Sequence, residues 1–166
     1  MSDRFLIWPD RRLSARATPV ERIGEAERAL WERMLTAMYA MPGVGLAAPQ
    51  IGVPLRLAVV DCAETGRAPI RLANPELVEI STETREHEEA SPNLPGVSAR
   101  IARPASVLVR YLDETGESRE RRFDGLWATS DQHQIDHLDG KLYFHRLGPV
   151  KRRMLLDRHA KLRRRG

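Results

Sequence analysis

Residues 133–137 read HQIDH and place two histidines four positions apart. If the stretch is helical, His133 and His137 lie one turn apart on the same face, where both imidazoles can bind one metal ion. In the HExxH pattern of zinc hydrolases, the Glu that follows the first histidine carries protons during the reaction. Gln134 holds that position here, and a carboxamide cannot accept the proton. The stretch therefore predicts a candidate metal site without its usual proton carrier.

Two other segments carry side chains that could belong to the same site. Residues 43–52, GVGLAAPQIG, combine small residues with Gln50, whose carboxamide can donate and accept hydrogen bonds. Taken alone, these glycines are equally typical of a tight turn between a helix and a strand. Residues 88–96, EEASPNLPG, contain two prolines and an Asn, which favour a turn-forming loop.

Helices are predicted at the start, in the late part and at the end of the chain. Apolar residues recur at helical spacing within residues 20–40. A second helix fits residues 125–138, with Asp124 as its N-cap and Gly140 just past its end. A third helix begins near Pro149. The histidine pair therefore falls on the second helix.

The predicted strands are short and close together along the chain, which favours antiparallel pairing. They are residues 55–60, 69–77, 105–113 and 118–123, the last two forming a hairpin that turns near Gly116. Helices and strands in this mixed order predict an α+β fold.

Composition predicts one globular domain spanning residues 1–166. The single cysteine, Cys62, excludes an internal disulfide and is typical of the cytoplasm, and no segment predicts a membrane span. Residues 151–166 carry eight Lys or Arg and one Asp. This basic segment indicates either a polyanionic partner such as RNA or a solvated helix face.

Taken together, the three segments resemble the peptide deformylase family, whose members remove the formyl group from the initiator methionine of new proteins. Members carry GxGxAAxQ, EGCLS and QHExDHLxG in this order, and this chain has GVGLAAPQ, EASPN and QHQIDHLDG at matching places. The flanking segments match as well, so the resemblance covers essentially the whole chain. It implies a peptide-deformylase-like α+β domain, with mostly antiparallel sheets around the histidine-bearing helix and a C-terminal helix.

The resemblance implies a metal site for Fe²⁺, Zn²⁺ or Ni²⁺. His133 and His137 match the two imidazole ligands, and Ser91 stands where the family has its ligand Cys. A neutral hydroxyl is a poor substitute for a soft thiolate, so we expect the ion to be bound weakly or not at all. Three neighbouring side chains are candidates for a substitute ligand: His87, Glu89 and Asp136.

The resemblance also implies the residues around the substrate. Gln50 matches the glutamine whose amide binds the substrate carbonyl, and Gly43 and Gly45 match the backbone beside the substrate. Gln134 stands at the general base, which in the family contributes roughly 10²–10⁴-fold in rate. Pro92 replaces a residue whose backbone N–H joins the oxyanion hole, a donor typically worth about 10²–10³-fold.

From these three losses we expect a catalytically inactive or strongly impaired protein. Two alternatives remain open at this point. One is an altered amide hydrolase with a substitute metal ligand. The other is a binding module without turnover, which holds formylated nascent peptides and contacts the ribosome through its basic C-terminal helix.

Overall fold

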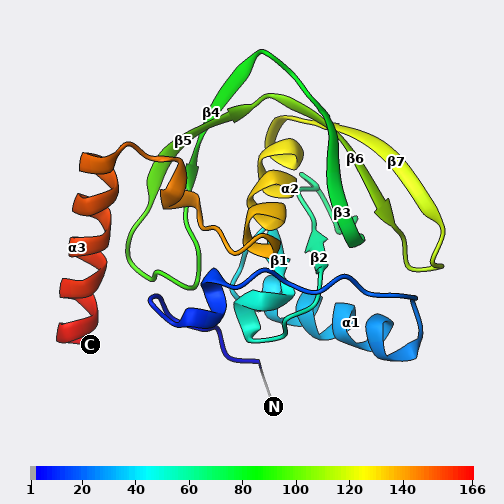
Figure 1. The fold of residues 1–166 in the computed structure, drawn as a ribbon, viewed down its shortest axis with the longest axis horizontal. Helices are drawn as coiled ribbons and strands as arrows, with labels where there is room; N and C mark the ends of the chain where they lie inside the picture. Colours follow the sequence, from blue (N-terminus) through cyan, green and yellow to red (C-terminus); the bar gives the residue numbers. More distant parts are fainter. Residues whose placement is uncertain (1–2) are drawn as a thin grey trace.

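Two antiparallel sheets enclose one central helix in the computed structural model, which describes residues 3–166 (Figure 1). The strands are β1 (Gly45–Ala47), β2 (Leu57–Val60), β3 (Ile70–Ile80), β4 (Thr84–Glu89), β5 (Ala99–Pro104), β6 (Ser106–Leu112) and β7 (Ser118–Asp124). The larger sheet has the order β1-β2-β3-β6-β7, and β4 pairs with β5 in the smaller one. The helices are α1 (Glu25–Ala40), α2 (Gly125–Leu138) and α3 (Pro149–Arg165). This architecture confirms the predicted α+β class.

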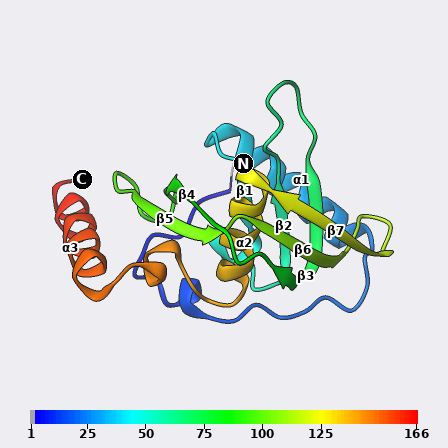
Figure 2. The same ribbon diagram turned by 90° about the horizontal axis from the view of Figure 1, so that it is seen from above.

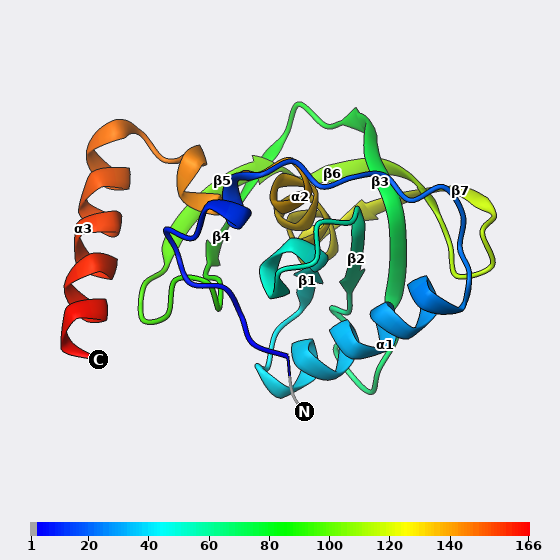
Figure 3. The same ribbon diagram turned by 60° about the horizontal axis from the view of Figure 1, so that its bottom comes forward.

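Helix α2 lies between the two sheets, as the nearly end-on view in Figure 3 shows. Its residues Ile135 and Leu138 are buried against apolar side chains of the larger sheet, among them Val60 and Val109. Helix α1 covers the strands β1 and β2 with a second apolar cluster that includes the fully buried Trp31. The apolar contacts between α2 and the larger sheet hold this helix in place, and with it the histidine pair.

Helix α3 lies at one end of the molecule, away from the larger sheet (Figure 2). It packs through Leu155 onto a third apolar cluster that contains Phe144. His159 on this helix is buried, with only 2% of its surface exposed. Its Nε2 lies 3.0 Å from the carbonyl oxygen of Trp8, which ties the helix to the N-terminal segment.

Several element boundaries differ from the prediction. Helix α1 begins at Glu25, not at residue 20, and β3 continues to Ile80, beyond the predicted end at residue 77. The hairpin of β6 and β7 and the third helix are confirmed. Asp124 is the N-cap residue of α2, but its side chain makes no capping hydrogen bond. Gly140 follows the helix with a φ of +78°, as a C-terminal glycine should.

Strands β4 and β5 had no counterpart in the prediction, and the segment from residue 88 was read as a loop. The sequence of β4, TREHEE, lacks alternating apolar residues because its stabilising partners are charged. Glu86 pairs with Arg100 on β5 at 3.1 Å, for example. None of the helices within residues 3–166 is long and apolar enough to cross a bilayer.

Candidate active site

One cavity of about 400 Å³ is lined by residues from all three of the segments singled out in the sequence. Strand β1 and the residues around it contribute one wall, the end of β4 and the following loop a second, and α2 the third. The predicted site residues on this lining are Gly43, Gly45, Gln50, Ser91, Pro92, His133 and Gln134. His137 lies one helical turn further along α2 and is fully buried, with its ring centroid 5.0 Å from that of His133.

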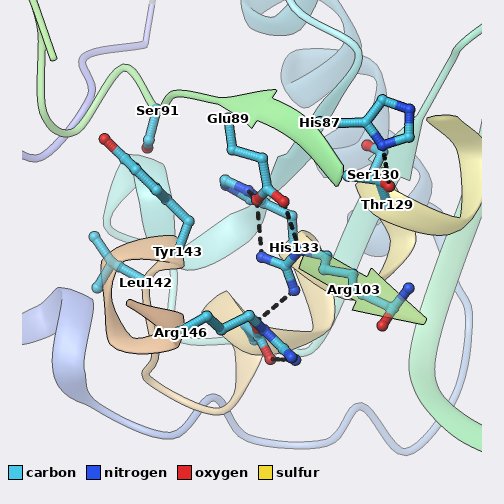
Figure 4. Close-up of polar contacts among 12 residues, drawn as sticks. His87, Glu89, Ser91, Arg103, Thr129, Ser130, His133, Leu142, Tyr143 and Arg146 are labelled. Carbon is cyan, nitrogen blue, oxygen red and sulfur yellow. Dashed lines mark hydrogen bonds and ion pairs between the residues drawn. The ribbon is translucent and has the colours of Figure 1, made fainter. Parts of the chain in front are cut away.

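His133 is held by a buried carboxylate, Glu89, at the end of β4 (Figure 4). Its Nδ1 lies 2.8 Å from Oε1 of Glu89, and the ring stacks on Tyr143 with 6.0 Å between centroids. Arg103 on β5, itself fully buried, donates to both oxygens of Glu89 at 2.6 and 2.8 Å. An ionised carboxylate accepts a hydrogen bond from an Nδ1–H, so Nε2 of His133 is directed away from Glu89.

These contacts keep Glu89 ionised. Burial by itself would raise its pKa, but the hydrogen bonds and charges of His133 and Arg103 outweigh burial and hold the pKa at about 2. Arg103 also binds Asp136 at 2.9 Å, and Arg146 binds Asp136 from the surface at 2.8 Å. Successive polar contacts therefore lead from His133 to the surface of the protein, through Glu89, Arg103, Asp136 and Arg146.

His137 has no hydrogen-bond partner on either ring nitrogen among the described residues. Burial, followed by the charges of His133 and Arg103, lowers its pKa well below the ordinary value, so the ring is neutral. The side-chain oxygen of Gln134 is also buried without a partner. Buried polar atoms normally have hydrogen-bond partners. A group bound beside His137 and Gln134 would supply the partners that these atoms lack.

Ser91, which also lines the cavity, is fixed by a hydrogen-bond network. Its hydroxyl donates to Oδ1 of Asn93 at 2.9 Å and accepts from Nε2 of Gln50 at 3.3 Å. The Gln50 oxygen accepts from the backbone N–H of Ala47 at 2.9 Å, which orients its amide toward Ser91 and Asn93. Asn93 is anchored in turn by a 2.6 Å bond to the carbonyl oxygen of Leu6.

The donor set supplies two of the three ligands that the family's divalent ion requires. His137, with two unpartnered nitrogens, and His133, with a free Nε2, fit as imidazole ligands, and Glu89 orients His133 as carboxylates orient metal-bound histidines. The third position holds the neutral hydroxyl of Ser91, which already forms hydrogen bonds with Asn93 and Gln50. Among residues 3–166, no three His, Cys, Asp or Glu side chains are grouped to hold an ion. The residues therefore do not fit a site with an anionic third ligand.

The three candidates for a substitute ligand are engaged elsewhere. His87 is not on the cavity lining, and its ring pairs with the hydroxyl of Thr129 at 2.8 Å. Glu89 is bound by Arg103 and His133, and Asp136 by the two arginines described above.

Gly45 also has a packing role. A side chain at this position would collide with Nε2 of Gln134 and Oγ of Ser130, both on α2. The glycine therefore lets β1 approach α2 closely and sets the width of the cavity between them. Pro92, which also lines the cavity, has no backbone N–H to donate.

Sequence reasoning missed Arg103 and Asn93 and considered Glu89 only as a substitute ligand. All three are polar side chains buried almost completely, at 1%, 0% and 5% exposure. Arg103 and Glu89 are charged and lie in segments whose sequences are typical of exposed strands. Their sequences therefore gave no sign that these side chains are buried.

Comparison with known proteins extends the picture to the whole chain. Residues 3–153 match the family model described as Polypeptide deformylase. A peptide deformylase from Mesorhizobium japonicum is 42% identical over 160 residues, covering 95% of this chain and 91% of that protein. Peptide deformylase 2 from Xanthomonas campestris is 41% identical, covering 96% and 95%. The crystal structure of a peptide deformylase from Legionella pneumophila superposes with a TM-score of 0.91 at 40% identity, covering 99% and 96%.

These relatives correct the expectation of an inactive or strongly impaired protein. Proteins about 40% identical over nearly the full length are named as the enzyme, so the comparisons imply catalysis and support neither a scaffold without turnover nor a pure binding module. The expectation rested on the replacements at Ser91, Pro92 and Gln134 alone. With its family match, its relatives and its fold in agreement, the chain belongs to the polypeptide deformylase family.

Proposed function

We propose that this protein hydrolyses the N-formyl group of peptides that begin with formyl-methionine, releasing formate and a free amine. The observation that carries the proposal is the cavity in which all three motif segments meet beside the oriented imidazole of His133. Relatives similar over the whole chain are named for this activity, which supports the same reaction here.

The cavity lining contains both apolar and polar groups that suit such a substrate. Met41, Val44 and Leu126 contribute apolar surface that suits a methionine side chain. Gln50 is held in place by its bond to the backbone of Ala47, and its long 3.3 Å bond to Ser91 is the one that a substrate carbonyl would replace. A preorganised donor of this kind stabilises the negative charge that develops on a carbonyl oxygen during attack.

We further propose that the divalent ion of this family is held weakly here. His133 and His137 are its candidate ligands, and a bound ion would supply Lewis-acid polarisation of the carbonyl. Replacing Ser91 by Cys restores a soft anionic ligand, so isothermal titration of the metal-free protein with Zn²⁺ should show much tighter binding for Ser91→Cys. Equal affinity in the two proteins would contradict weak binding.

The activity is tested by measuring formate release from a short formyl-methionyl peptide, with the unformylated peptide as a blank. Gln50→Ala should lower kcat/KM by about 10²–10³-fold, as expected for loss of an oxyanion donor. Ser118→Ala, an exposed hydroxyl on β7, is the matched control for purification and folding. Absence of formate release from wild type, with and without added Zn²⁺, would refute the proposal.

We also propose that α3 contacts ribosomal RNA in the cytoplasm and so brings the enzyme to nascent chains. Its last residues are exposed and basic, including Arg164 and Arg165. Reversing both charges should weaken co-sedimentation with ribosomes and flatten its salt dependence. Reversal of the exposed Arg4 and Arg22 is the control, and equal effects of the two double variants would contradict a role for α3.

A further inference from the structure

The side of α2 that faces the cavity is mostly polar, including the part that lies before the histidine pair. Its lining residues recur at the spacing of one helix face and are Leu126, Thr129, Ser130, His133 and Gln134. The hydroxyls of Thr129 and Ser130 lie one turn before His133, and Leu126 lies one turn before them. A substrate whose formyl group lies at His133 therefore meets two hydroxyls before it meets the apolar residue.

Distance along the helix identifies the part of the substrate that lies beside these hydroxyls. A rise of about 1.5 Å per residue places Ser130 and Thr129 about 4.5 and 6 Å before His133. In a formylated residue, the extended path from the formyl carbon to the third side-chain atom measures about 6 Å. That atom is the sulfur of methionine or the amide carbon of glutamine. A first side chain that extends along α2 therefore brings this atom level with the two hydroxyls.

Both hydroxyls are held by other elements and retain unused hydrogen-bonding capacity. Oγ1 of Thr129 lies 2.8 Å from Nδ1 of His87 on β4 (Figure 4). Oγ of Ser130 donates to the carbonyl oxygen of Val44 at 3.2 Å. A hydroxyl has one proton and two acceptor lone pairs. Ser130 uses its proton and can still accept, and Thr129 keeps a lone pair in either tautomer of His87.

We propose that the cavity also accepts formylated peptides whose first side chain is an uncharged hydrogen-bond donor of methionine's length, best represented by glutamine, and favours them over apolar side chains of that length. The inference rests on the proposed deformylation and adds a substrate class to it. A carboxamide has two N–H donors, one for the oxygen of Thr129 and one for that of Ser130. The sulfur of methionine is only a weak acceptor and has no proton to donate.

Burial restricts this position to neutral side chains. Thr129 and Ser130 are only 5% and 4% exposed, so an ion beside them would lose its hydration without gaining an opposite charge from either hydroxyl. The two carboxylates on the lining already have partners. Glu89 is in an ion pair, and Glu88 accepts from the hydroxyl of Ser98 at 2.8 Å. A neutral donor is therefore the side chain that fits the pair of hydroxyls.

The test uses formylated peptides that differ only in the first residue, which is glutamine, methionine, norleucine or lysine. Norleucine has methionine's length and no hydrogen-bonding atom. Formate release is measured with added Zn²⁺ for wild type, Thr129→Val and Ser130→Ala. Wild type should prefer glutamine to norleucine, and the ratio of the two kcat/KM values should fall about fivefold in each variant, the scale of one hydrogen bond. Thr36→Val, which removes an exposed hydroxyl from α1, is the control and should leave the ratio unchanged.

Isothermal titration of the metal-free proteins with the same peptides adds a measurement that needs no turnover. Formate release that favours norleucine, or a ratio that both variants leave unchanged, would overturn the inference while deformylation stands. Tighter binding of the glutamine peptide that both variants weaken, without formate release from any peptide, would support the inference and overturn the proposed function. A preference for the lysine peptide would overturn the uncharged side chain. Neither formate release nor any difference in affinity would overturn both proposals.

Discussion

Asp131 is an ionisable side chain buried in α2 without compensation, and it provides a sharp test of the energetics. It is fully buried, and neither carboxylate oxygen has a hydrogen-bond partner among residues 3–166. Burial raises the pKa of this carboxyl well above its ordinary value, and the charge of Arg121 only partly opposes the effect. The folded protein therefore keeps the proton over a range in which the unfolded chain has lost it.

The sign and size of the effect follow from linkage. Above the unfolded pKa of about 3.9, the unfolded state binds fewer protons than the folded state, so the free energy of unfolding falls as pH rises. The slope is about 1.4 kcal/mol per pH unit until the folded carboxyl ionises. Between about pH 4 and pH 7 the loss can therefore reach, at most, roughly 4 kcal/mol.

Asp131→Asn removes the titration and keeps the shape of the side chain. We expect the variant to resemble wild type near pH 4 and to be more stable at pH 7, with a melting temperature higher by on the order of 10 °C. Urea unfolding monitored by circular dichroism at several pH values measures the difference, and Asp157→Asn, an exposed position on α3, is the control. A stability difference that is independent of pH, or a variant less stable at pH 7, would refute the reasoning.

Three further outcomes are expected. Arg103→Leu leaves the buried Glu89 without its arginine and Asp136 with Arg146 alone, and it should lower the free energy of unfolding by about 3–5 kcal/mol in urea titrations, whereas the exposed Arg110→Leu should change it little. Gly45→Ala should push α2 from β1 and reduce kcat/KM about tenfold or more in the formate assay; an unchanged value would mean that the cavity width is not critical. Tyr39→Phe removes a 2.6 Å bond to Asp61, a carboxyl whose pKa is lowered by that bond and by backbone N–H groups against the effect of burial. The variant should lose about 1 kcal/mol at pH 7 and progressively less as pH falls through the folded pKa, and a loss that persists in acid would contradict this assignment.

The sequence was sufficient to predict the elements whose capping residues, apolar spacing or turn residues lie within one short segment. Helix α2 was located at its observed bounds because capping residues and apolar spacing agree within one short segment. The hairpin of β6 and β7 was found because alternation and a turn glycine lie close together in the chain. The histidine pair and the carboxamide of Gln50 were recognisable from residue type and spacing, whereas Ser91 was singled out only through the family resemblance.

Tertiary structure decided which of those groups are partnered. The bond between Glu89 and His133 joins residues 44 positions apart, and the clamp by Arg103 depends on the pairing of β4 with β5, whose charged sequences carry no apolar alternation. The burial of Asp131 and His159 likewise depends on surfaces contributed by distant elements. Residue types and their spacing thus determined by themselves the fold class and which side chains could do chemistry. Only packing decided the partners and desolvation of those side chains, because both depend on contacts between residues far apart in the chain.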